Sequence, residues 1–113
     1  MTPATFRRLA LSLPEALEFS HMNHPDFRVR GKVFASLGSP EQDHGTVKLT
    51  PAQQEAEMAE HPAVFTPAAG AWGRRGYTVV RLRAATAINL RRAMRAAWHN
   101  TAPTSLRDQH EVS

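Results

Sequence analysis

The side chains most able to do chemistry in this chain are its cations, and they are unevenly distributed. Residues 1–60 hold six Lys or Arg and eight Asp or Glu, whereas residues 61–107 hold eight Arg and no acid. The second segment therefore carries a charge of +8, although the formal net charge of the 113 residues is only +4. Such asymmetry is typical of proteins that bind a polyanion, and it is also compatible with an arginine-rich soluble surface.

Several cations are expected on one side of a β-sheet. Side chains alternate between the two faces of a strand, so cations that alternate with apolar residues share the polar face. Arg28, Arg30, Lys48 and Arg81 alternate with apolar neighbours in this way, and Tyr77 falls on the same side as Arg81. An open sheet face with cations and an aromatic ring can bind phosphates and stack a base. The alternative is an ordinary polar outer face.

Two turns add further basic residues to this surface. Arg74 and Arg75 lie between two glycines, in a turn that can contact a nucleic-acid backbone. Lys32 belongs to the expected hairpin turn that follows Gly31. The residues expected to bind nucleic acid, DNA in particular, are therefore Arg28, Arg30, Lys32, Lys48, Arg74, Arg75, Tyr77 and Arg81. The alternative use of the same face is to bind a small anionic ligand or another protein.

Catalytic and metal chemistry find less support. The chain has no cysteine, which excludes disulfides, thiolate metal sites and cysteine nucleophiles. It contains no nucleophile elbow, phosphate-binding glycine loop or His-Glu-x-x-His motif. The best candidate metal ligands are His21, His24 and Asp26, with His44 across the strands, but polar residues are common at such loop positions. We therefore expect a protein that is not an enzyme and needs no metal or cofactor.

A third group of basic residues lies on the C-terminal helical segment. Arg91, Arg92, Arg95 and His99 occupy one side of this segment, away from its apolar residues. Cations near the C-terminal end of a helix also interact favourably with the helix dipole, so a structural role is sufficient to explain them.

The elements that must position these residues can be predicted from periodicity. Residues 50–53, Thr-Pro-Ala-Gln, form a capping box with proline at the first helical position, which indicates a helix start. Ala52, Ala56 and Ala59 are expected to form the inner stripe of that helix. We expect helices over residues 2–13, 50–61 and 86–99, and strands over residues 17–22, 27–30, 33–37, 46–49 and 77–82.

These elements predict an α+β fold in the order α-β-β-β-β-α-β-α. The expected architecture is a single antiparallel sheet with the helices packed on one face. One domain is expected over residues 1–106, followed by a disordered tail over residues 107–113. Since no run of about 18 apolar residues occurs, we expect no membrane-spanning segment and a location in the cytoplasm. We also expect a monomer that makes no membrane contact.

Several segments resemble the MmcQ/YjbR family, in order along the chain. The resemblance extends from about Phe6 to Pro103. The segments that carry it are residues 24–29, 31–35, 47–51, 61–64, 73–82, 97–98 and 102–103.

The resemblance implies a fold similar to that of the bacterial frataxin homologue and a protein of the kind described as DNA-binding. It implies no catalytic residue. Two positions differ from the family pattern, because Tyr77 stands where many members have Trp, and Ala68-Ala69-Gly70 replaces a bulkier stretch. A frataxin-like role in iron binding depends on an acidic first helix, whereas residues 1–13 contain no acid and two arginines.

Overall fold

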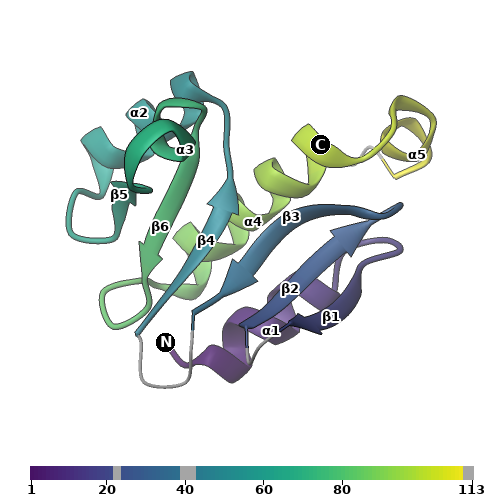
Figure 1. The fold of residues 1–113 in the computed structure, drawn as a ribbon, viewed down its shortest axis with the longest axis horizontal. Helices are drawn as coiled ribbons and strands as arrows, with labels where there is room; N and C mark the ends of the chain where they lie inside the picture. The colour runs from purple at the N-terminus through teal and green to yellow at the C-terminus, as the bar shows by residue number, and fades with distance from the viewer. Residues whose placement is uncertain (22–23, 39–42, 111–113) are drawn as a thin grey trace.

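The protein has an α+β fold built on one antiparallel sheet (Figure 1). The computed structural model describes residues 1–21, 24–38 and 43–110. The strand order is β1-β2-β3-β4-β6-β5, and every neighbouring pair is antiparallel. The strands are β1 (Leu17–His21), β2 (His24–Val29), β3 (Lys32–Leu37), β4 (His44–Lys48), β5 (Phe65–Pro67) and β6 (Tyr77–Arg81). The helices are α1 (Pro3–Leu11), α2 (Pro51–Glu60), α3 (Gly70–Arg74), α4 (Ala87–Thr101) and α5 (Thr104–Gln109).

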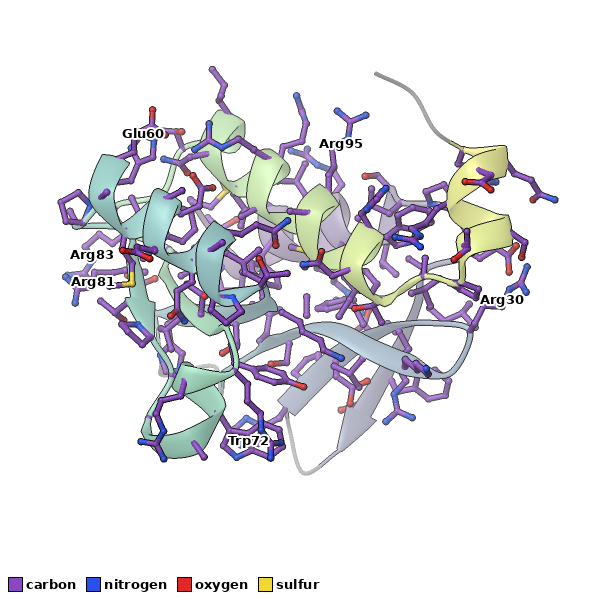
Figure 2. The ribbon with its side chains drawn as sticks, turned by 90° about the horizontal axis from the view of Figure 1, so that it is seen from above. Arg30, Glu60, Trp72, Arg81, Arg83 and Arg95 are labelled. Atoms are coloured by element: carbon purple, nitrogen blue, oxygen red, sulfur yellow. The ribbon has the colours of Figure 1, made fainter. Side chains whose placement is uncertain are left out.

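Helices α1, α2 and α4 cover one face of the sheet, as the sequence predicted. Figure 1 looks onto the other face, with α1 and α4 behind the strands, and the view turned by 90° in Figure 2 separates the two layers. Helix α3 belongs to neither layer, because it is a short connection between the edge strand β5 and β6. We call the uncovered face the open face. Within the described residues, no helix is long and apolar enough to cross a membrane.

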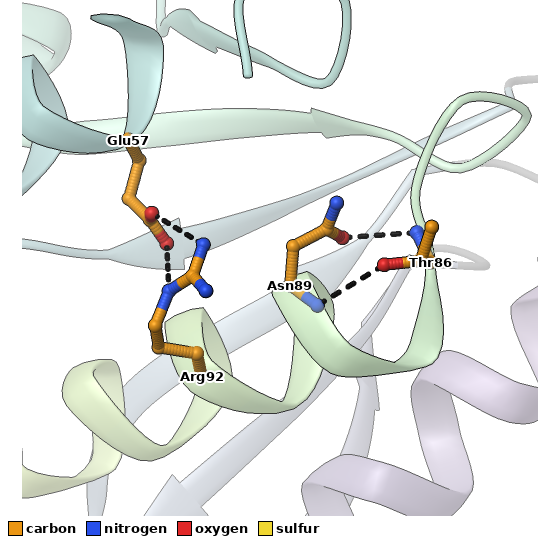
Figure 3. A network of polar contacts seen from close by, with 4 residues as sticks. All are labelled: Glu57, Thr86, Asn89 and Arg92. Atoms are coloured by element: carbon orange, nitrogen blue, oxygen red, sulfur yellow. Dashed lines mark hydrogen bonds and ion pairs between the residues drawn. The ribbon is translucent and has the colours of Figure 1, made fainter. Parts of the chain in front are cut away.

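Threonine caps begin the three longer helices where the sequence predicted starts. The hydroxyl of Thr2 accepts a hydrogen bond from the backbone N–H of Thr5, and Pro3 fills the first helical position. Thr50 begins α2 with the complete capping box, and Thr86 begins α4 with a second box through Asn89 (Figure 3).

The core lies between the sheet and the helices and contains the apolar residues that alternation selected. Alternation along the strands and helical spacing in the helices predict a core of eleven residues, of which ten are buried and one, Leu13, is half-buried at the core margin. These ten are Leu9, Phe27, Val29, Phe34, Val47, Leu49, Val80, Leu82, Leu90 and Met94. A β-bulge explains why the consecutive residues Phe34 and Ala35 are both buried, since the register between β2 and β3 shifts beside them.

Strand β1 puts its apolar residues on the open face. Leu17 is 61% exposed and Phe19 is 45% exposed, and they pair with Arg28 and Asp26 of β2. Glu18 points the other way, toward α1, where its Oε1 lies 2.6 Å from the Nε of Arg7. The open face at this edge is therefore more apolar than the sequence pattern indicated.

The prediction that alanines form the inner stripe of α2 was wrong. Ala52, Ala56 and Ala59 are exposed, whereas Glu57 is buried. The Glu57 carboxylate accepts two hydrogen bonds from Arg92 of α4, at 2.7 and 3.2 Å (Figure 3). Glu57 can face inward in place of the alanines because both of its carboxylate oxygens are hydrogen-bonded to Arg92.

The structure contains three elements that the sequence did not predict. Strand β5 and helix α3 lie in the Pro- and Gly-rich segment that was expected to be irregular. Helix α5 continues past residue 106, where the ordered domain was expected to end, and buries Leu106. Residues 111–113 of the expected tail lie outside the described residues.

Candidate nucleic-acid interface

Two aromatic rings and two cations meet on the open face beside α3. The ring of Trp72 meets the ring of Tyr77 edge-on, with centroids 5.0 Å apart and planes at 87°. The Arg75 guanidinium lies 5.6 Å from the centre of the Trp72 ring, and the Lys48 ammonium lies 5.9 Å from the centre of the Tyr77 ring. Trp72 is 57% exposed. We call Trp72, Tyr77, Lys48 and Arg75 the aromatic platform, and Figure 2 shows Trp72 below the sheet.

The sheet and α2 hold this platform in place. Lys48 and Tyr77 are register partners across β4 and β6, so their side chains share a face. Gln54 of α2 donates from Nε2 to the carbonyl oxygens of Gly73 and Tyr77 and to the hydroxyl of Thr78, each at 3.1 Å. Because Gly73 and Tyr77 flank the end of α3, these hydrogen bonds fix α3, and with it Trp72, relative to β6.

Gly76 makes the sharp return from α3 into β6. Its φ is +106°, and a Cβ at this position would lie 2.0 Å from the carbonyl oxygen of Leu49. Its own carbonyl accepts hydrogen bonds from the Leu49 N–H at 3.2 Å and the Thr78 hydroxyl at 2.7 Å. Only glycine fits both the backbone conformation and the close approach.

Arg28 lies on the open face as predicted, but an acid already engages it. It donates to both carboxylate oxygens of Asp26, at 2.9 and 3.2 Å, and this hydrogen bonding to Asp26 raises the pKa of Arg28. Its guanidinium also stacks on the Phe19 ring at 4.5 Å from the centroid. An arginine that is neutralised in this way attracts phosphate less than an unpaired one.

Arg30 is not on the open face, so its predicted placement there was wrong. It occupies the hairpin turn with Gly31, and both residues have positive φ, 51° and 82°, as two-residue hairpin turns of the I′ type require. Alternation does not apply within such a turn. Its guanidinium donates to both oxygens of Glu15, at 2.6 and 2.9 Å. This hydrogen bonding lowers the pKa of Glu15 and raises that of Arg30.

The remaining predicted residues are spread along the open face and its borders. Arg81 pairs with His44 at the opposite end of β6 from Tyr77, about 13 Å away at the usual rise of a strand. Arg74 is exposed at the end of α3, and Lys32 is exposed at the start of β3. The structure therefore brings together Lys48, Arg75 and Tyr77, with Arg74 adjacent.

None of the five ion pairs found in the described residues includes the platform cations or the adjacent Arg74. The pairs are Arg7–Glu18, Arg28–Asp26, Arg30–Glu15, Arg83–Asp43 and Arg92–Glu57. Within the same described residues, no carboxylate lies within ion-pair distance of Lys48, Arg74 or Arg75. Three cations that have no acid partner among the described residues therefore lie together beside α3.

Trp72 is the functional residue that the sequence did not single out. The segment from Trp72 to Gly76 was expected to be a turn, and a turn gives no face on which to place the ring. In the structure α3 directs the indole onto Tyr77. A tryptophan separated by one glycine from two arginines, in a segment expected to be a turn, was the available signal, because large aromatic side chains are usually buried and a turn offers no core to bury one.

The candidate metal ligands do not form a cluster in the described part of the chain. No group of three or more His, Asp or Glu side chains there is placed to hold a metal ion. Asp26 is committed to Arg28, and the side chain of His21 is outside the described residues.

Comparison with known proteins gives the fold and the family. The chain is similar to the crystal structure of a Deinococcus radiodurans protein with a domain designated DUF419, with a TM-score of 0.77 and 18% identity over 99% of this chain and 89% of that one. At this identity the likeness shows a common fold. No curated protein matches the chain. The model of the YjbR family matches residues 11–100, and the chain therefore belongs to the YjbR family.

Proposed function

We propose that this protein binds nucleic acid, with DNA as the proposed ligand, and that it prefers single strands to duplex. The observation that carries the proposal is the aromatic platform, in which an exposed Trp72 meets Tyr77 between two cations. Stacking on an aromatic ring combined with a cation for the neighbouring phosphate is the usual way to hold an unpaired base. The platform is complete in one chain and requires no enzymatic activity, cofactor or second subunit.

The preference for single strands follows from the kind of contact on offer. Bases in a duplex are already stacked on one another, so an exposed indole gains little from duplex DNA. Bases in a single strand have free faces, and stacking one on an aromatic side chain contributes about 1–3 kcal/mol. Arg75 of the platform and the adjacent Arg74 supply contacts to phosphates, which position the strand without selecting its sequence.

A small-molecule pocket at the aromatic platform has less support. The hollow beside Lys48 and Tyr77, which also touches Ser36 and Thr46, has a volume of only about 30 Å³. Pockets for small ligands are usually about 300 Å³ or more. The surface at the platform therefore favours a ligand that lies across it, and the larger hollow of the open face, about 370 Å³, lies at the far end of β6 around His44, Val79 and Arg81.

The test is a salt titration of binding to labelled single-stranded DNA, duplex DNA and single-stranded RNA. Each phosphate contacted on a single strand contributes about −0.7 to the slope of log K against log salt. Three to four engaged cations on the open face then give a slope of roughly −2 to −3. The double variant Arg74→Ala/Arg75→Ala should reduce the magnitude of the slope by about 1.4.

A matched control separates this surface from general charge. Arg91→Ala/Arg95→Ala removes the same charge from the helical side and should leave single-strand affinity within about twofold, because these residues lie away from the platform. Trp72→Ala should weaken single-strand binding by roughly 1–3 kcal/mol and duplex binding much less. Equal losses from the two double variants, or no binding at low salt by a protein shown to be folded, would contradict the proposal.

A further inference from the structure

A groove separates α1 from α4 on the side of the molecule opposite the aromatic platform. Its volume is about 460 Å³, which is within the range of small-ligand sites. It is lined by Leu9, Ser12, Leu13, Pro14, Arg91, Met94, Arg95, Trp98, His99 and His110. Figure 2 shows Arg95 above the helical layer and Trp72 below the sheet, so the groove and the platform lie on opposite sides.

The floor of the groove is apolar and rigidly held. Leu9, Met94 and Trp98 are buried core residues that also form its inner wall. The indole N–H of Trp98 donates to the carbonyl oxygen of Pro14 at 3.0 Å, so its one polar atom is already satisfied. The floor can therefore accept an apolar group without leaving a polar atom unpaired.

The rim of the groove is basic. Arg91 and Arg95 lie one turn apart on α4, and His99 follows after another turn. Among the described residues, no acid lines the groove, and no ion pair includes Arg91 or Arg95. Arg92, by contrast, points to α2 and is paired with Glu57. Two neighbouring guanidinium groups without an acid are therefore available at the edge of an apolar hollow.

We propose that this groove binds a small organic anion with an apolar body and a carboxylate or phosphate head. The body lies on Leu9, Met94 and Trp98, while the head is held by Arg91 and Arg95, whose planar donors match both kinds of head. The arrangement is the usual one for a small-ligand site, with a mostly apolar lining and a few polar groups that fix orientation. This site is independent of the proposed nucleic-acid interface.

The two tryptophans allow each face to be followed separately. A protein labelled with ¹⁵N gives one indole N–H signal from Trp98 in the groove and one from Trp72 on the open face, and a Trp72→Phe variant assigns them. The probes are decanoate, decyl phosphate, decanol and acetate. Ligand efficiencies typical of small molecules place the Kd for decanoate in roughly the millimolar range.

The proposal expects decanoate and decyl phosphate to shift the Trp98 signal in a saturable way and to leave Trp72 in place. Arg91→Gln/Arg95→Gln should weaken binding about tenfold, whereas the matched Arg74→Gln/Arg75→Gln change should alter it less than twofold. Both pairs are exposed, so both variants should fold. The proposal is overturned if decanol binds as well as decanoate, if acetate binds as well, if the Arg91/Arg95 variant binds normally, or if Trp98 does not respond. None of these outcomes depends on nucleic-acid binding.

Discussion

Gln54 is the side chain on which the position of the aromatic platform most depends, and replacing it by alanine should measurably destabilise the protein. Its Nε2 has two N–H donors and meets three acceptors at 3.1 Å, on Gly73, Tyr77 and Thr78. At most two full hydrogen bonds form at once, and each contributes a net 0.5–1.5 kcal/mol, roughly. The upper limit of the loss is therefore about 3 kcal/mol.

The acceptors that Gln54 leaves behind retain other partners, which lowers this estimate. The carbonyl of Gly73 also accepts from the Gly76 N–H at 3.1 Å, and the carbonyl of Tyr77 accepts from the Ala68 N–H at 2.9 Å. We therefore expect Gln54→Ala to cost about 1–2 kcal/mol and to lower Tm by roughly 4–8 °C. Alanine is the better helix former, so a loss of stability must come from the missing contacts.

Urea and thermal unfolding followed by circular dichroism measure this change. The matched control is Glu55→Ala, the next position on α2, which is exposed and should change stability by no more than about 0.5 kcal/mol. The account of how α2 holds α3 is refuted if the two variants are equally stable within the error of the measurement.

Two further predictions concern the ion pair between α2 and α4 and the turn into β6. A double-mutant cycle of Glu57→Ala and Arg92→Ala, measured by urea unfolding, should give a coupling free energy of about 1 kcal/mol. This value is low for a bidentate ion pair because Arg92 is half-exposed. A coupling free energy near zero would contradict the structural role of the pair. Gly76→Ala should cost at least about 2 kcal/mol, since the added Cβ meets the Leu49 carbonyl in a left-handed conformation. A melting temperature equal to that of the unaltered protein would contradict this close approach.

The sequence predicted the fold well because most elements had local signals. Helix starts were set by threonine caps, and strand faces were set by alternation, as the burial of Val29 and Val80 shows. Alternation failed where the backbone leaves a regular strand. Arg30 was misplaced because it belongs to a turn, and the bulge beside Phe34 shifts the phase of its strand.

The candidate site was harder to predict because it depends on contacts between distant segments. The inward face of α2 is polar, and its partners lie 19 to 24 residues away for Gln54 and 35 residues away for Glu57. No local sequence pattern indicates partners at this distance along the chain, so the alanines were predicted to face inward instead. Trp72 was overlooked for the same reason, because its role is visible only once α3 places it beside Tyr77.

The indole N–H signals of the two tryptophans, followed during titration with a short single-stranded DNA, test the central claim most directly. Trp72 lies on the proposed interface and Trp98 lies on the far side, beneath α1. Binding across the open face predicts that the Trp72 signal moves to saturation while the Trp98 signal stays in place. Movement of Trp98 alone, or of neither signal in a folded protein, would contradict it.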